Sequence, residues 1–101
     1  MSEVVRVLPL DQLSSEKINE WRAWLLRIKY ILASRDDAEK EYYDADGLYT
    51  MLEYSDETDT IYFVEKMISF LRKLKQSNTK IPQPPESLID YIKSIVPEFE
   101  Y

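Results

Sequence analysis

Apolar side chains recur with the 3.6-residue period of an α-helix in three long stretches of this 101-residue chain. Such a pattern gives each helix one apolar face, which must be buried against another element. The stretches cover about residues 14–35, 37–54 and 56–76. We therefore predict an all-α protein whose core, residues 14–76, consists of three amphipathic helices.

The first helix has the clearest start. Ser14 is a good N-cap residue, and Leu13 and Ile18 have the spacing of a hydrophobic staple. We expect this helix to end near Arg35. Its apolar stripe consists of Ile18, Trp21, Trp24, Leu25, Ile28, Ile31 and Leu32.

The second helix contains the one glycine of the chain. Asp36 and Asp37 are suitable caps for its first turn. Gly47 lies near its middle and costs about 1 kcal/mol relative to alanine, so a break or kink is expected at this residue. Its apolar stripe consists of Ala38, Tyr42, Ala45, Tyr49 and Leu52.

The third helix has the most regular stripe. Ser55 or Asp56 is its expected cap. The basic residues Arg72, Lys73 and Lys75 near its end suit the negative end of the helix dipole. Its apolar stripe consists of Ile61, Phe63, Val64, Met67, Ile68, Phe70, Leu71 and Leu74.

The two ends of the chain read differently from this core. Residues 1–13 are rich in β-forming valines up to Pro9 and are predicted to be an extended N-terminal arm. Residues 77–85 form a proline linker, and residues 86–101 contain a short helix and an aromatic tail. The predicted fold is thus a small three- to four-helix bundle with an extended N-terminal arm. The apolar residues of the short helix are Leu88, Ile89, Ile92, Ile95 and Val96.

The chain contains neither histidine nor cysteine, which restricts its chemistry. Histidine is the only side chain whose unperturbed pKa lies near neutral pH, and zinc and copper sites rely on histidine and cysteine. Without either, the usual bases that activate a nucleophile are absent. We therefore predict that the protein is not an enzyme and has no catalytic residue, metal site or cofactor. The absence of disulfides fits a cytoplasmic location.

One segment resembles the calcium-binding loop of EF-hand proteins. Tyr42–Glu53 matches the loop pattern at its third, fifth, sixth, ninth and twelfth positions, which hold Asp44, Asp46, Gly47, Thr50 and Glu53. The resemblance implies that the side-chain oxygens of Asp44, Asp46, Thr50 and Glu53 bind calcium. The first position is Tyr42 where the family has an aspartate ligand, and the flanking residues lack the apolar pattern of EF-hand helices. The prediction of no metal site therefore stands.

Negative charge is concentrated in one part of the chain. The formal net charge is −6, which disfavours nucleic acids and anionic membranes as partners. Residues 36–60, called the acidic block below, contain ten acidic residues and one basic residue. The block either attracts the more basic helices on both sides of it, or forms a docking surface for a partner with a basic surface.

Several apolar residues lie off the predicted core stripes and are our candidate contacts with another protein. Tyr43, Met51 and Tyr54 lie on the acidic side, and exposed tyrosines are common in binding hot spots. Leu26 and Tyr30 lie four residues apart on the first helix, opposite its main face. A homodimer that uses this second apolar face is therefore one of the predicted arrangements. We predict a small acidic adaptor or accessory subunit that binds another protein and has no membrane span.

Two alternatives remain at this point. The first is a small subunit of a nucleic-acid-handling complex, in which a basic patch contacts backbone phosphates within the larger assembly. This patch consists of Lys66, Lys73, Lys75 and Lys80. The second is an inhibitor that mimics nucleic acid and occupies a basic enzyme.

Overall fold

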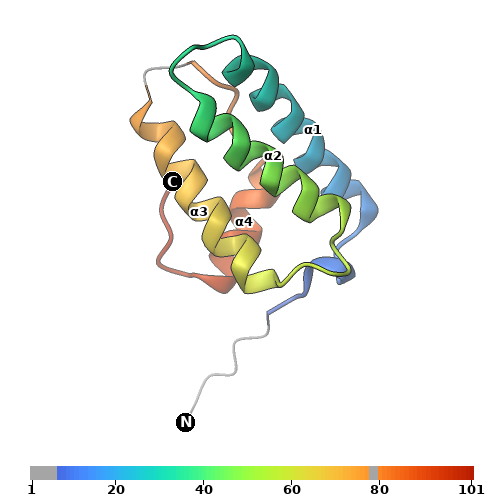
Figure 1. Cartoon of the computed structure of the whole chain (residues 1–101). Helices are drawn as coiled ribbons and strands as arrows, with labels where there is room; N and C mark the ends of the chain where they lie inside the picture. The colour runs from blue at the N-terminus through green and yellow to red at the C-terminus, as the bar shows by residue number, and fades with distance from the viewer. Residues whose placement is uncertain (1–6, 78–79) are drawn as a thin grey trace.

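The computed structural model describes residues 7–77 and 80–101. These residues form a bundle of α-helices without a strand among them, as predicted (Figure 1). The predicted N-terminal arm, residues 1–13, lies partly outside the described residues, which begin at residue 7. The elements are the 3₁₀ turn η1 (Leu10–Gln12) and the helices α1 (Ser15–Ala33), α2 (Glu39–Glu53), α3 (Thr60–Gln76) and α4 (Glu86–Ile95).

The described part of the arm is not extended throughout. Residues 10–12 form η1, in which the Gln12 amide donates to the Pro9 carbonyl at 3.0 Å. Leu10 is buried, and its amide donates to Thr60 Oγ1 at 3.1 Å. Burial of this leucine against the start of α3 explains why the chain turns here, since a buried side chain gains more than a solvated extended strand without a partner.

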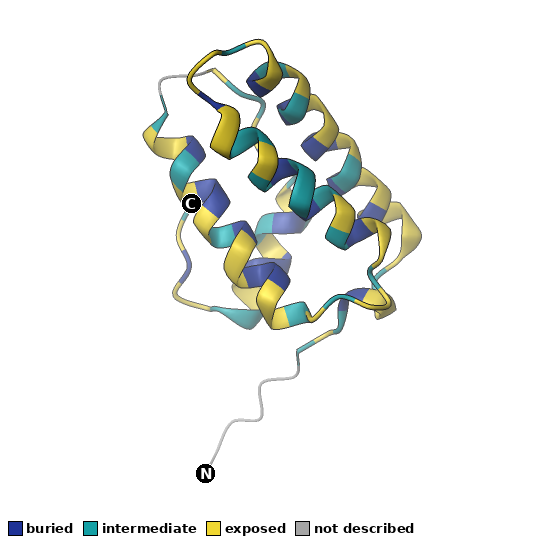
Figure 2. Cartoon of the chain, viewed as in Figure 1, coloured by how far each residue is buried: buried dark blue, intermediate teal, exposed yellow. Residues whose placement is uncertain are grey.

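Two tryptophans of α1 form the centre of the core. The Trp21 ring stacks on Phe63 of α3 at a centroid distance of 6.5 Å and packs against Tyr91 of α4 at 5.3 Å. Trp24 meets Phe70 of α3 edge to face at 6.3 Å. These large rings fill the space between α1 and α3, and Figure 2 shows the buried residues on the inward faces of the helices.

The polar edges of both indoles are satisfied by the C-terminal part of the chain. Trp21 Nε1 donates to Ser87 Oγ at 2.9 Å, and the Ser87 hydroxyl donates to the Glu20 carboxylate. Trp24 Nε1 donates to the Pro82 carbonyl at 3.0 Å. The linker and α4 are therefore held against α1 by directional bonds in addition to apolar contacts.

The predicted N-cap residue is correct for α1 and wrong for α2. Ser14 caps α1 as predicted, since its side chain accepts from the Lys17 amide at 3.2 Å. Neither Asp36 nor Asp37 caps α2, whose N-cap is Ala38 without a side-chain bond. Asp37 instead pairs with Arg35 at 3.3 Å, and the Arg35 guanidinium lowers the pKa of this carboxyl.

The start of α3 lies later than predicted. Its cap is Asp59, whose side chain accepts from the Tyr62 amide at 2.9 Å, rather than Ser55 or Asp56. The residues before Asp59 are needed to close α2, because Thr58 Oγ1 lies 2.9 Å from the Met51 carbonyl and 2.8 Å from the Tyr54 carbonyl. The intervening turn thus satisfies carbonyls at the end of α2.

Two features of α2 also differ from expectation. The helix continues through Gly47 without a break, and no described residue has a positive φ. Leu48, which the predicted stripe omitted, is buried, whereas Tyr42 and Tyr49 are only half-buried at the edge beside α1. Packing of the buried face therefore outweighs the intrinsic cost of the glycine.

Other core assignments change near the ends of the elements. Ile61 belongs to the predicted apolar stripe of the third helix but is 45% exposed, because it lies in the first turn of α3, at the end of the bundle. Tyr91 is not among the predicted apolar residues of the short helix, yet it is buried, and its hydroxyl donates to the Leu8 carbonyl at 2.6 Å. Phe99 in the tail is also buried.

Tyr91 leads to a pH-dependent prediction. Burial raises the pKa of its hydroxyl to about 12, whereas an unfolded tyrosine has a pKa of about 10. Its contribution to stability is therefore complete below pH ~10 and is lost as the pH rises towards about 12. Tyr91→Phe loses the bond to Leu8 and should lower the unfolding free energy at pH 8 by about 0.5–1.5 kcal/mol.

The measurement is urea unfolding of both proteins at pH 8 and pH 11. The wild type should lose about 1 kcal/mol more than Tyr91→Phe between these pH values, since only the wild type has the Tyr91 proton to lose. Tyr30→Phe, at an exposed position, is the matched control and should follow the wild type. An equal pH-dependent loss in the wild type and in Tyr91→Phe would contradict this prediction.

Candidate functional site

A surface groove runs between α2 and α3, which lie side by side in Figure 1. We call it the α2–α3 groove, and its volume is about 200 Å³. It combines exposed aromatic rings, lysines and a glycine. The lining residues are Tyr43, Asp44, Gly47, Leu48, Met51, Tyr62, Lys66, Ser69, Phe70 and Lys73.

Gly47 leaves a gap in the α2 wall of this groove, because it has no side chain. It lies between Tyr43 and Met51 at four-residue spacing, so the three residues share one face of α2. A Cβ atom built on Gly47 would have no neighbouring heavy atom within 4 Å, and its φ is not positive. Neither crowding nor backbone conformation in the described structure requires glycine here, although alanine is favoured in a helix by about 1 kcal/mol.

Aromatic rings mark the two ends of the groove. Tyr43 is 62% exposed and meets the ring of Tyr42 edge to face at 5.5 Å. Tyr62, at the other end, is 49% exposed, and the Lys66 ammonium lies 5.4 Å from its ring centroid. Partly exposed tyrosines supply large contact areas at a small loss of side-chain entropy.

The charges of the groove are unevenly satisfied. Lys73 Nζ forms an ion pair with Asp44 Oδ2 at 2.8 Å across the two helices. Lys66 has no carboxylate within ion-pair distance among the described residues, and its ammonium lies over the Tyr62 ring instead. The groove therefore carries an excess positive charge, although α2 itself is acidic.

The structure brings together residues that the sequence analysis had assigned to rival sites. Tyr43 and Met51 were candidate protein contacts, and Lys66 and Lys73 were candidate phosphate contacts, yet all four line the α2–α3 groove. Tyr54 is exposed but lies beyond the end of α2 and is not part of the lining.

The remaining candidates lie elsewhere. Leu26 and Tyr30 are exposed and line a shallow hollow of about 260 Å³ between α1 and α2. Lys75 lies over the ring of Tyr101 at 4.9 Å, and Lys80 is exposed in the linker. Only two of the four lysines of the predicted basic patch therefore line the groove.

The acidic block pairs with cations on the neighbouring helices and at the end of α1. Asp46 accepts from Lys29 at 2.8 Å, and this hydrogen bond raises the pKa of the lysine. Glu53 lies 3.9 Å from Arg22. With the pairs of Asp37 and Asp44, four of the ten acidic residues of the block form ion pairs within the described part of the chain, which supports intramolecular attraction for that part of the block.

The segment that resembles an EF-hand loop is helical in the structure. Residues 42–53 all belong to α2. Asp44 points to Lys73 on α3, and Asp46 points to Lys29 on α1. The two carboxylates therefore diverge instead of converging on one ion. Within the described ranges 7–77 and 80–101, no group of three or more acidic side chains is placed to hold a metal ion.

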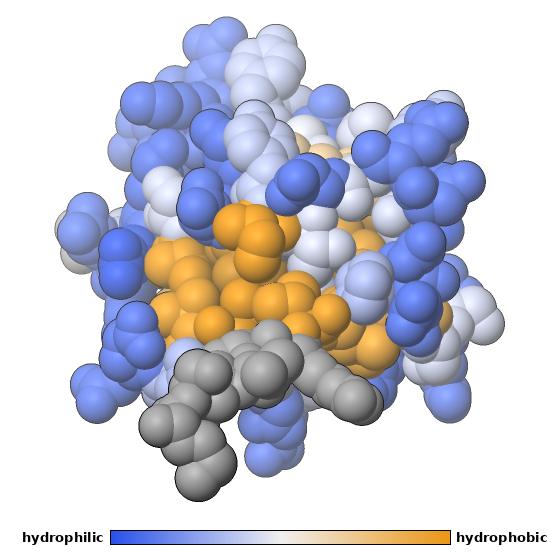
Figure 3. Space-filling view, turned by 90° about the horizontal axis from the view of Figure 1, so that it is seen from below, coloured by the Kyte–Doolittle hydropathy of each residue, from blue (hydrophilic) through white to orange (hydrophobic). Residues whose placement is uncertain are grey.

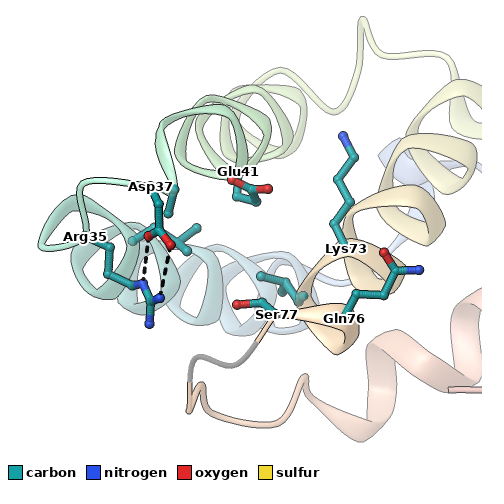
Figure 4. Close-up of a pocket in the computed structure, with 9 residues that line it drawn as sticks. Arg35, Asp37, Glu41, Lys73, Gln76 and Ser77 are labelled. Carbon is teal, nitrogen blue, oxygen red and sulfur yellow. Dashed lines mark hydrogen bonds and ion pairs between the residues drawn. The ribbon is translucent and has the colours of Figure 1, made fainter.

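A second hollow, of about 310 Å³, lies where the end of α1 meets the start of α2 and the end of α3 (Figure 4). It contains two carboxylates, from Asp37 and Glu41. Figure 4 shows Asp37 turned to Arg35, whereas Glu41 lies apart on the side of Lys73. A general acid needs a raised pKa, and the lowered pKa of Asp37 makes it unsuited to that role.

An exposed apolar surface that the sequence analysis did not identify lies at the end of the bundle where α3 begins. Figure 3 shows this face with its concentration of apolar side chains. Leu8 and Ile61 are 43% and 45% exposed. Their segments meet at this end, since Leu10 bonds to Thr60 and Tyr91 bonds to Leu8.

Comparison of the chain with protein-family models, curated proteins and solved structures gives no match. None of the helices in the described part of the chain is long and apolar enough to cross a membrane.

Gly47 gives the prediction that tests this geometry. Gly47→Ala should raise the free energy of unfolding by about 0.5–1 kcal/mol, because alanine favours the helix and the added methyl group meets nothing. The measurement is urea unfolding at neutral pH. The matched control, Ala23→Gly at an exposed position of α1, should lower stability by a similar amount. Loss of stability in Gly47→Ala would show that the fold itself needs the glycine.

Proposed function

We propose that this protein is a non-catalytic adaptor or accessory subunit whose α2–α3 groove binds a segment of another protein. The observation that carries the proposal is Gly47, a destabilising residue in an open part of a helix with no structural need for it. Glycine is used where the backbone of a binding partner must approach closely. The exposed rings of Tyr43 and Tyr62 supply contacts at either end of such an approach.

The size of the groove supports a protein segment rather than a small molecule. Its volume of about 200 Å³ is below the ~300–1,000 Å³ of ordinary small-molecule pockets. A groove of this size between two helices suits a few side chains of a longer partner. The rest of the partner would contact the helix surfaces on either side.

The nucleic-acid alternative has weaker support. A backbone contact needs several cations that point to solvent together. Lys73 is paired with Asp44, Lys75 lies over the Tyr101 ring, and only Lys66 of the groove has no ion pair among the described residues. Two lysines, one of them already paired with Asp44, are therefore the cations that this groove offers in one place, which is few for a phosphate backbone.

The test compares partners captured by the wild type and by Gly47→Leu from a lysate of the native host, with nuclease treatment. A Cβ atom at this position meets no heavy atom within 4 Å and leucine favours the helix, so the variant should fold and its side chain should block the groove. We expect a nuclease-resistant partner whose recovery falls at least tenfold with Gly47→Leu. The control Ala23→Leu, on the exposed side of α1, should retain it.

Equal recovery by the wild type and Gly47→Leu would contradict the proposal. Loss of every partner on nuclease treatment would instead favour the nucleic-acid alternative.

A further inference from the structure

The lysines of α3 indicate which kind of segment the α2–α3 groove accepts. Lys66 and Lys73 both line the groove and are seven residues apart, which is two helical turns or about 10.5 Å along the axis. Lys66 has no ion pair among the described residues. Lys73 uses one contact on Asp44, and an ammonium group has three donors. Two cationic donors therefore lie along the α3 wall of the groove.

The opposite wall and the floor are mostly apolar. Met51 and Leu48 come from α2, and Phe70 comes from α3. Gly47 leaves open space in the middle, between the levels of the two lysines, because α2 and α3 run antiparallel with Asp44 beside Lys73. An apolar side chain of a partner, placed over Gly47, would thus lie between the levels of Lys66 and Lys73 along α3.

Resting on the proposed function, we propose that the partner segment is an acidic amphipathic helix that lies along α3. It places an apolar residue over Gly47 and carboxylates seven residues apart opposite Lys66 and Lys73. A helix has the matching two-turn repeat, and the missing side chain at Gly47 lets its backbone come close. The charge of this partner segment is opposite to that of the basic partner surface expected from the acidic block.

The charge of the groove favours this occupant over a basic one. A basic segment would place cations beside Lys66 and Lys73 and would compete with Lys73 for Asp44. An acidic segment satisfies Lys66, and its second carboxylate shares the Lys73 ammonium with Asp44, since an ammonium group has three donors. Electrostatic complementarity of this kind decides which partners are accepted more than how tightly they bind.

The experiment is a selection of helical peptides displayed on phage against the folded full-length chain. In the library, the first and eighth positions of each peptide are Glu, Lys, Gln or Ala, and the fourth and fifth positions are apolar. We expect Glu to be enriched over Lys at the two flanking positions by roughly fivefold or more. Selection on Lys66→Glu should reverse the preference at one flanking position.

Two variants serve as controls. Lys93→Glu changes the same charge on an exposed position of α4 and should leave the preference unchanged. Gly47→Leu should abolish binding of the selected peptides, and thermal unfolding verifies that all variants are folded.

The outcomes separate this inference from the proposed function. Peptides that are lost with Gly47→Leu but carry Lys, or show no charge preference, would overturn the acidic helix while leaving the groove as the binding site. Peptides that tolerate Gly47→Leu, or no enriched peptide at all, would contradict both.

Discussion

The structure depends on the two tryptophans of α1. Trp21 and Trp24 contact α3 through Phe63 and Phe70, and their indole N–H groups bind Ser87 and the Pro82 carbonyl. One helix thereby fixes α3, the linker and α4, and α2 packs most extensively on α1 as well. Because α2 is held mainly from the α1 side, its opposite edge meets α3 less closely and leaves the groove at Gly47.

The sequence was sufficient to predict the α-helices of the described residues, but not the turn η1 or the exact helix starts. The helical period identified the α-helices, and Ser14 correctly marked the start of α1. Asp59 was missed as the cap of α3, because the preceding turn had several suitable residues, and only the bonds of Thr58 show which of them belong to α2. Buried Tyr91 packs against Trp21 and bonds to Leu8, 83 residues away, and no local pattern contains these contacts.

The candidate site was predictable residue by residue but not as one surface. Tyr43 and Met51 stood out as apolar residues off the core stripe, and Lys66 and Lys73 stood out by charge. Their meeting in one groove depends on the rotation of α2 relative to α3, which buries Leu48 and places Asp44 beside Lys73. From the sequence, Gly47 predicts a break or kink in the helix. Only the folded structure shows that a side chain at this position would have no neighbour within 4 Å of its Cβ atom.

The most direct measurement is a map of backbone amide chemical shifts by NMR as a selected acidic peptide is added to the chain. Binding in the groove predicts that the largest shifts lie in residues 43–51 of α2 and 62–73 of α3, with little change around Leu26 and Tyr30 of α1. Largest shifts on α1, or at the apolar end of the bundle around Leu8 and Ile61, would contradict the assignment of the groove as the binding site.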